Sequence, residues 1–221
     1  MTFSPQIIDM IKTGIWETLY MVFASSAISY LIGIPLGIIL VVTDKDGIYP
    51  EPLFQKALGL VINLLRSVPF MILLIMVLPL TRMIIGTTLG AKAVVPPLVI
   101  AAAPYIARMV ESSFKEVDAG VIEAAKSMGA STFQIIWKVL LPEAKPSLLV
   151  GAAISVTTIL GYSAMAGFVG GGGLGTIAIN YGYYRYQTDM MLVTVAILVI
   201  IVQIIQEVGM KLAKISDKRI R

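Results

Sequence analysis

Five long apolar stretches, separated by shorter polar segments, dominate the chain. They are Ile15–Val42, Ala57–Leu80, Ala93–Val110, Pro146–Phe168 and Met190–Met210. A helix needs about 20 apolar residues to cross a hydrocarbon core about 30 Å thick. The first stretch has 28 residues, about 42 Å of helix at roughly 1.5 Å per residue, so we expect it to tilt or to bend near Pro35. The pattern predicts an all-α polytopic membrane protein with five transmembrane helices.

Two of the predicted spans contain residues that are unusual inside a membrane helix. The second stretch is interrupted by Arg66 and Pro69, and the third contains three prolines. An arginine at the centre of a span costs roughly 2.5–3.5 kcal/mol on insertion scales, so it normally has a partner or a role. The alternative is that Arg66 extends its charged end to the cytoplasmic interface. We treat Arg66 as a candidate intramembrane charge.

The composition agrees with a membrane protein and excludes several kinds of chemistry. Of the 221 residues, 57% are hydrophobic and 14% are charged, whereas a soluble domain has about 25% charged residues. Cysteine is absent, which excludes disulfides and thiolate sites, and histidine is absent, which removes the commonest general base and metal ligand. We therefore expect no catalytic residue, no metal site and no cofactor in this chain.

The Lys and Arg residues outside the spans are distributed unevenly between the two sides of the membrane. With five spans, 12 of them lie on one side and 4 on the other, and Arg66 is left within a span. Because Lys and Arg accumulate in cytoplasmic loops, we predict that the N-terminus is outside and the C-terminus is cytoplasmic. The basic tail from Lys211 is then expected near anionic lipid rather than nucleic acid. Residues 1–221 are expected to form a single membrane domain, whose spans occupy about 14–210.

The longest predicted cytoplasmic loop contains a polar segment, residues 118–142, that reads as two short helices. Asp118 is the expected N-cap of the first helix, and Gly129 is expected to end it. Ser131 and Gln134 form a capping box at the start of the second helix, which Pro142 is expected to end. Each helix has an apolar stripe to bury. The stripes are Val121, Ile122, Ala125 and Met128 in the first helix, and Phe133, Ile136, Trp137 and Leu140 in the second.

The same segment carries a spaced motif. Its residues are Glu123, Ala124, Ala125, Gly129, Leu141 and Pro142. This spacing resembles the cytoplasmic coupling motif of ATP-binding cassette (ABC) importer permeases, EAA, three residues, G, nine residues and I-x-L-P, with Val139 in place of the usual Ile. The resemblance implies that the segment docks in a cleft of an ATPase subunit and passes its motion to the spans. The alternative is an amphipathic interfacial helix, but such a helix usually has a polar face rich in Lys and Arg, whereas the charges here are balanced.

A glycine-rich stretch, "GYSAMAGFVGGGGLGTIAINYGYYRY", follows the fourth predicted span. Gly170, Gly172 and Gly175 match G-x-G-x-x-G, but they follow an apolar span rather than a strand, so we expect no nucleotide site. Instead, the stretch resembles the methionine importer branch of the permease family, and the resemblance extends over nearly the whole chain. The resemblance implies transport of a small amino acid, with methionine as the first candidate. The alternative is that the chain transports another small solute.

The last turns of the fourth span are the predicted gate or translocation path. Tyr162, Ser163 and Met165 lie there among small residues that permit close helix approach. Met165 is a candidate plug because its side chain is flexible and polarizable, and a packed core methionine is the alternative. The Gly33–Gly37 motif, G-x-x-x-G, indicates a contact between subunits or within the chain, unless it is a chance occurrence in a long apolar run.

The resemblance also implies partners and a mechanism. The partners are a second copy of the chain, two ATPase subunits that bind ATP and Mg²⁺, an external solute-binding protein and the lipid of a bacterial inner membrane, without nucleic acid. A secondary transporter or channel would usually keep an ionisable group in mid-membrane, but Glu17 and Glu207 lie at span ends. An intramembrane protease would need a base, and there is no His. We therefore expect a non-enzymatic permease that works by alternating access.

Overall fold

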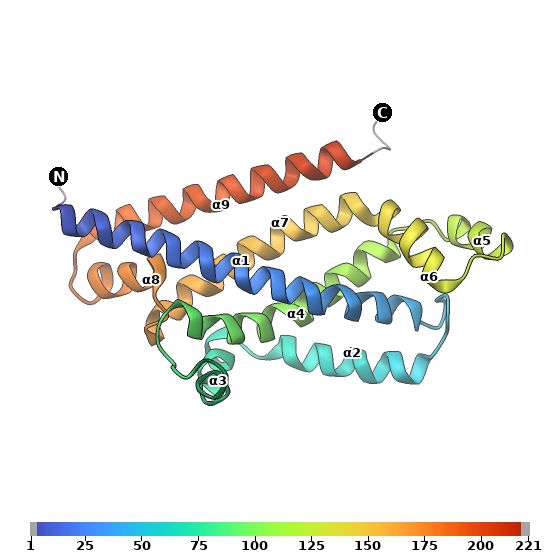
Figure 1. Cartoon of the computed structure of the whole chain (residues 1–221), viewed down its shortest axis with the longest axis horizontal. Helices are drawn as coiled ribbons and strands as arrows, with labels where there is room; N and C mark the ends of the chain where they lie inside the picture. Colours follow the sequence, from blue (N-terminus) through green and yellow to red (C-terminus); the bar gives the residue numbers. More distant parts are fainter. Residues whose placement is uncertain (1–3, 218–221) are drawn as a thin grey trace. The chain divides into compact units, whose positions relative to one another are not determined.

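Residues 4–217 are described by a computed structural model, in which they form helices and no strand (Figure 1). The longer helices are α1 (Pro5–Val42), α2 (Pro52–Ser67), α3 (Phe70–Ile85), α4 (Ala91–Lys115), α7 (Leu141–Met165) and α9 (Thr188–Ser216). The shorter ones are α5 (Ala119–Ser127), α6 (Thr132–Ile135), α8 (Gly173–Ile177), the π-helices η1 (Ile136–Leu140) and η3 (Ala178–Tyr183), and the 3₁₀-helix η2 (Ala166–Val169). Lipid offers no hydrogen bonds to the backbone, which favours helices that bond internally. The all-α prediction is confirmed.

The number of membrane spans agrees with the prediction if one broken pair of helices is counted as a single crossing. Within residues 4–217, four helical runs are long and apolar enough to cross alone: α1, α4, the continuous run Thr132–Val169, and α9. Helices α2 and α3 pass the same test only together, which gives up to five spans. The break falls at Val68 and Pro69 because proline disfavours helical geometry in the preceding residue and cannot donate a backbone hydrogen bond.

One boundary prediction is wrong: Pro142 does not end a helix. It lies in the first turn of α7, which continues directly from α6 and η1. The Leu141 N–H donates to the Ile136 carbonyl, five residues back, in π-type bonding. Proline is tolerated in the first turn of a helix, and α-type bonding starts at Leu141, one residue before Pro142. The second helix of segment 118–142 therefore runs without interruption into the fourth span.

The C-terminal tail is described only in part. Helix α9 continues to Ser216, so Lys211 and Lys214 are helical residues. Lys218, Arg219 and Arg221 of the predicted basic tail lie outside the described residues.

The chain forms two compact units. Unit 1 comprises the described residues of Met1–Ile28, with Val68–Ala102 and Val156–Gln206, and unit 2 comprises Ser29–Ser67, Ala103–Ser155 and the described residues from Glu207 onward. In unit 1, a core of Leu174, Ile177 and Met190 is covered by apolar side chains of α1 and α9. In unit 2, a core of Leu40, Ile62 and Ala107 joins α1, α2 and α4.

The Gly33–Gly37 motif makes a contact within unit 2. A Cβ atom added at Gly33 would lie 2.6 Å from Ile106 Cγ2, and one added at Gly37 would lie 2.6 Å from Val110 and 2.7 Å from the Ala107 carbonyl oxygen. The absence of side chains on α1 thus allows the backbones of α1 and α4 to approach closely. Of the alternatives raised by the sequence, the structure supports a contact within the chain.

Replacement of Gly37 by alanine should destabilise the protein by about 1–3 kcal/mol, because the added methyl group would press on backbone atoms of α4 that cannot rotate away. The matched control is Gly161→Ala, since a Cβ atom at Gly161 meets nothing within 4 Å. The measurement is the thermal unfolding midpoint of the detergent-solubilised protein. Equal midpoints for the two variants would contradict the close approach.

Candidate functional site

The first helix of segment 118–142 has the predicted ends. The Asp118 side chain accepts a hydrogen bond from the Gly120 N–H at 2.8 Å and caps α5. After the helix, Gly129 adopts φ +75°, a left-handed conformation that glycine takes without steric cost. The Gly129 N–H donates to the Lys126 carbonyl at 2.9 Å, and the Ala130 N–H donates to the Ala125 carbonyl at 3.1 Å. Gly129 therefore closes α5 by its backbone conformation.

The second helix begins at the predicted capping box. The Gln134 N–H donates to Ser131 Oγ at 3.3 Å, and the Ser131 N–H donates to Gln134 Oε1 at 2.8 Å. Two backbone N–H groups at the start of the helix, which have no acceptor within the helix, are thus bonded to nearby side chains. Since α6, η1 and α7 are continuous, this cap is the cytoplasmic start of the helix that forms the fourth span in the predicted topology.

Only part of the apolar surface on this segment is buried within the chain. Ile135 and Leu140 are buried, as is Ala125 of the motif. By contrast, Met128 is 81% exposed, Phe133 71% and Trp137 64%. The Phe133 and Trp137 rings stack in parallel, with centroids 6.4 Å apart. We call these three exposed apolar residues of segment 118–142 the coupling patch.

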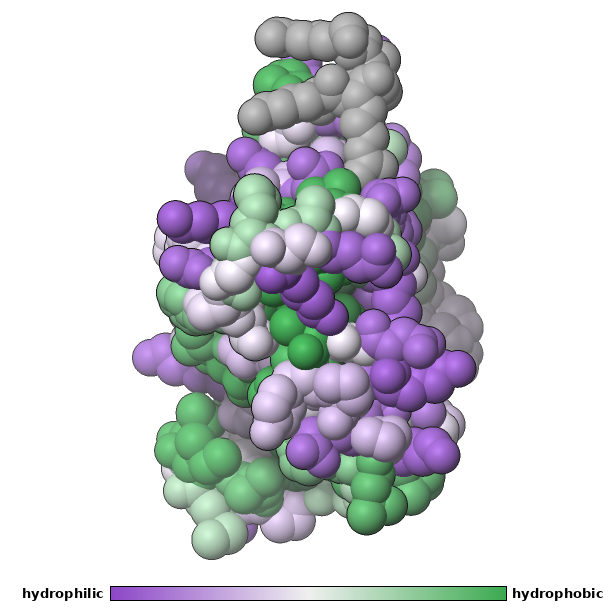
Figure 2. Space-filling view, turned by 90° about the vertical axis from the view of Figure 1, so that its right-hand side faces the viewer, coloured by the Kyte–Doolittle hydropathy of each residue, from purple (hydrophilic) through white to green (hydrophobic). Residues whose placement is uncertain are grey.

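The coupling patch lies in the same segment of the chain as the exposed residues of the motif. Glu123, Ala124, Gly129 and Pro142 are exposed, and Leu141 is half-buried. Figure 2 views this end of unit 2, where hydrophilic residues cover much of the surface and hydrophobic residues lie between them. An apolar patch with a polar rim is typical of a surface that binds another protein. Sequence reasoning had expected the side chains of Met128, Phe133 and Trp137 to be buried, and it missed them as contact residues.

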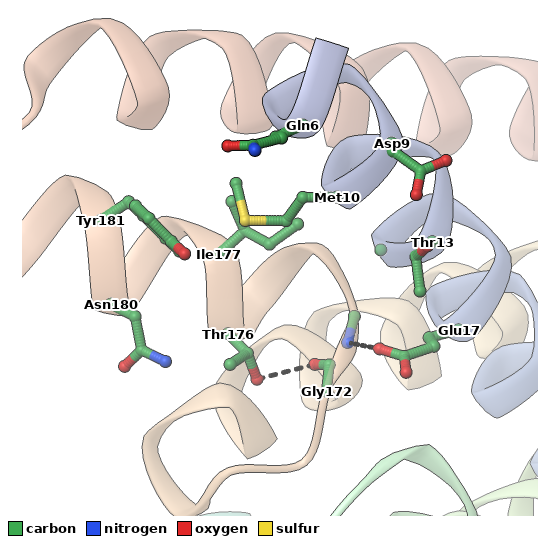
Figure 3. Close-up of a pocket in the computed structure, with 12 residues that line it drawn as sticks. Gln6, Asp9, Met10, Thr13, Glu17, Gly172, Thr176, Ile177, Asn180 and Tyr181 are labelled. Atoms are coloured by element: carbon green, nitrogen blue, oxygen red, sulfur yellow. Dashed lines mark hydrogen bonds between the residues drawn. The ribbon is translucent and has the colours of Figure 1, made fainter. Parts of the chain in front are cut away.

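In unit 1, the glycine-rich stretch forms a turn that α1 holds in place. Gly170, Gly172 and Gly173 all have positive φ. One Glu17 carboxylate oxygen accepts a hydrogen bond from the Gly173 N–H at 2.6 Å, as Figure 3 shows. The Thr18 hydroxyl accepts from the Leu174 N–H at 2.9 Å and donates to the Gly14 carbonyl at 2.8 Å.

These bonds replace a cap that α8 lacks. The residue before α8 is Gly172, which has no side chain to accept from the first N–H groups of the helix. Glu17 and Thr18 supply the acceptors from a position 156 residues earlier in the chain. Such a long-range cap leaves no local signal, so sequence reasoning placed Glu17 at a span end without giving it a role.

A cavity of about 380 Å³ lies next to this long-range cap (Figure 3). Its lining from α1 includes Gln6, Asp9, Met10 and Glu17, and its lining from α8 and η3 includes Thr176 and Tyr181. Two carboxylates and no Lys or Arg line it. Among residues 4–217, no three His, Cys, Asp or Glu residues are grouped so that they could hold a metal ion.

The predicted gate residues have three different environments in unit 1. The Tyr162 ring stacks on Phe70, with centroids 4.5 Å apart and an interplanar angle of 7°. Ser163 is 1% exposed, and its hydroxyl donates to the Leu160 carbonyl of its own helix at 2.7 Å. Met165 is 42% exposed, so within this chain it is not a core residue. Of the three predicted gate residues, Met165 is the most exposed within this chain.

Arg66, the predicted intramembrane charge, lies in the last turn of α2. Its Cζ atom lies 6.0 Å from the centroid of the Tyr105 ring on α4, at the limit of a cation–π contact. An aromatic partner within unit 2 is therefore in place for this charge.

Comparisons with known proteins agree along almost the whole chain. The family described as "Binding-protein-dependent transport system inner membrane component" matches residues 7–221. A Vibrio cholerae protein named "Probable D-methionine transport system permease protein MetI" is 49% identical over 211 residues, which are 96% of this chain and 94% of that protein. The "Methionine import system permease protein MetP" of Bacillus subtilis is 44% identical over 204 residues, 92% of each chain. A solved chain of the MetNI methionine ABC transporter, in inward-facing conformations, is 42% identical with a TM-score of 0.96, over 98% of this chain and 100% of that one.

Replacement of Glu17 by alanine should loosen the turn before α8, because the partly buried Gly173 N–H would lose its acceptor at a cost of about 1–3 kcal/mol. Glu17→Gln should have a smaller effect, since its amide oxygen can still accept. The measurement is hydrogen exchange at residues 170–177 in detergent micelles, with Asp9→Ala as the control carboxylate of the same helix and cavity. Unchanged protection in Glu17→Ala would show that the cap does not hold the turn.

Proposed function

We propose that this chain is the permease subunit of an ATP-driven importer of methionine. The chain belongs to the family of binding-protein-dependent transport system inner membrane components. The assignment of methionine as the substrate rests on the extent of the sequence similarity. Relatives named for methionine transport are 49% and 44% identical over more than nine-tenths of this chain. The resemblance inferred from the sequence motifs is confirmed, and the protein resides in a bacterial inner membrane.

The permease works with partners that supply energy and substrate. Two copies of the chain pair with two ATPase subunits, and an external solute-binding protein delivers the substrate. The coupling patch supports the ATPase contact, because it leaves three large apolar side chains without cover in this chain. ATP and Mg²⁺ are bound by the ATPase, and the sequence of this chain has no G-x-x-x-x-G-K-S/T loop that would cradle phosphates. The chain itself performs no covalent chemistry.

Transport proceeds by alternating access. The ATPases close on ATP and draw the two coupling segments, residues 118–142, together. Since α6, η1 and α7 are continuous, displacement of the second coupling helix is passed to the fourth span and to the gate residues near its end. ATP stabilises the outward-open state, and hydrolysis returns the pair to the inward-open state.

Reconstitution of the complete complex tests this function. Vesicles that contain the permease, the ATPase and the binding protein should take up labelled methionine only when ATP is present on the ATPase side. A tenfold excess of unlabelled methionine should abolish uptake, and the same excess of other small amino acids serves as the specificity control. If the vesicles took up a different solute in an ATP-driven manner and did not take up methionine, the assignment of methionine as substrate would be wrong. The assignment of the chain to an ATP-driven importer would still stand.

Gly129→Val should lower ATP-driven uptake much more than it lowers the amount of inserted permease. A β-branched residue disfavours positive φ, whereas burial of the spans in lipid does not depend on this turn. Gly86→Val is the matched control, because Gly86 also has positive φ, +85°, with nothing within 4 Å, but lies at the end of α3. The measurements are ATPase copurification and uptake. Equal losses in both variants would attribute the effect to backbone strain alone and remove the coupling role.

Met165→Ala should let substrate leak across the membrane without ATP, because removal of a flexible side chain opens the path that it closes. The control is Met83→Ala, since Met83 is also an exposed methionine but lies on α3, outside the gate. The measurement is efflux of preloaded methionine from vesicles that hold the permease complex without ATP. Equal efflux from the two variants would remove Met165 from the gate.

A further inference from the structure

Four charged side chains in unit 2 form a continuous series of ion pairs along α4 and the α1–α2 loop. They are Asp44, Lys115, Glu111 and Arg108, which we call the α4 charge chain. Arg108, Glu111 and Lys115 lie on one face of α4, at spacings of three and four residues. Lys115 Nζ donates to Asp44 Oδ2 at 2.8 Å and to Glu111 Oε1 at 2.9 Å, and Arg108 Nη1 donates to Glu111 Oε2 at 2.6 Å.

Glu111 is the buried centre of this series. Its side chain is 7% exposed, and each of its two carboxylate oxygens accepts from a different cation. Desolvation of a carboxylate is unfavourable unless such partners compensate for the lost water. A buried ion pair adds little stability compared with apolar residues of the same volume, so a stability role alone does not explain why a charge is present here.

The two cations connect Glu111 to different parts of unit 2. Arg108 Nη2 donates to the Gly59 carbonyl at 2.9 Å, and Arg108 Nε donates to Asn63 Oδ1 at 3.2 Å, so one end of the series is fixed to α2. Gly59 leaves room for the guanidinium, because a Cβ atom there would lie 2.9 Å from Arg108 Nη2. At the other end, Lys115 is bonded to Asp44, which is the second residue after the end of α1.

The Asp44 end of the series lies against the coupling segment. A cavity of about 450 Å³ is lined by Asp44 and Gly47 of the loop, by Lys115 of α4, and by Ile122 and Leu140 of the coupling segment. Lys126 of α5 donates to the Gly47 carbonyl at 3.4 Å. The hydrogen bond from Lys115 also holds the pKa of the Asp44 carboxyl below its usual range.

We propose that the α4 charge chain is a positioning device that transmits displacement of the coupling segment through the α1–α2 loop and α4 to α2, with Glu111 as its central residue. The inference rests on the proposed function, and it adds a second connection to the continuous helix that leads from α6 into α7. None of the four side chains touches substrate or ATP in this role. Their loss should therefore change how much transport each hydrolysed ATP drives, rather than whether the complex forms.

The test compares methionine molecules imported with ATP molecules hydrolysed in vesicles that contain the full complex. Glu111→Gln removes the buried charge and preserves the shape of the side chain. Asp44→Ala breaks the ion pair with Lys115 at a loop position, where a substitution should disturb folding least. Each variant should lower the ratio by about threefold or more, within the range seen when one link of a coupling network is removed. Because both act on one series, the double variant should be no worse than the poorer single variant.

The matched control is Lys45→Ala, in the same loop. Lys45 pairs with Asp46 at 3.6 Å, but both side chains are about four-fifths exposed, and neither belongs to the α4 charge chain. The control should keep the wild-type ratio. A normal ratio in both Glu111→Gln and Asp44→Ala would overturn this inference but not the proposed function. The same conclusion would follow if uptake and hydrolysis fell only in proportion to the amount of folded complex. Absence of ATP-driven import by the wild-type complex would overturn the proposed function and the inference with it.

Discussion

The unbroken helix from Thr132 to Val169 is the feature on which the functional architecture depends. It begins at a capping box in the polar segment and includes a short π-helical section, Ile136–Leu140, just before Pro142. It reaches Tyr162, Ser163 and Met165 near its end. A helix resists bending because each backbone hydrogen bond constrains its neighbours. In the proposed function, a movement imposed on the polar end is passed along this continuous helix.

The two ends of this helix are held by different means. At the start, Gly129 forms the turn that follows α5. The side chains of Asp118 and Ser131 accept hydrogen bonds from backbone N–H groups at the starts of α5 and α6. At the far end, the glycine turn leads into α8, whose first N–H groups are capped by Glu17 and Thr18 of α1. The first arrangement leaves an apolar surface open for a partner, and the second ties the turn to the body of unit 1. The proposed function uses both arrangements, because in it one end receives a force from the ATPase and the other keeps its shape near the substrate.

The sequence was sufficient for features whose causes are local. Span positions follow from apolar runs, the break between α2 and α3 follows from Pro69, and the caps of α5 and α6 follow from Asp118 and the Ser131–Gln134 pair. It failed at Pro142, because tolerance of proline depends on the hydrogen-bond register of the preceding turn. It also failed at Phe133 and Trp137, since an apolar stripe does not reveal whether it is buried by its own chain or by a partner. Glu17 was missed because its hydrogen-bond partner lies 156 residues away.

Thiol accessibility tests most directly whether the coupling segment faces the cytoplasm and binds the ATPase. The chain has no cysteine, so Met128→Cys and Tyr186→Cys each introduce a single thiol at a highly exposed position, 81% and 87% exposed respectively in the native residues. A membrane-impermeant maleimide should label Tyr186→Cys from outside the cell and Met128→Cys only in inside-out vesicles, and bound ATPase should protect Met128→Cys alone. Labelling of both thiols from the same side, or labelling of Met128→Cys that the ATPase does not change, would contradict this arrangement.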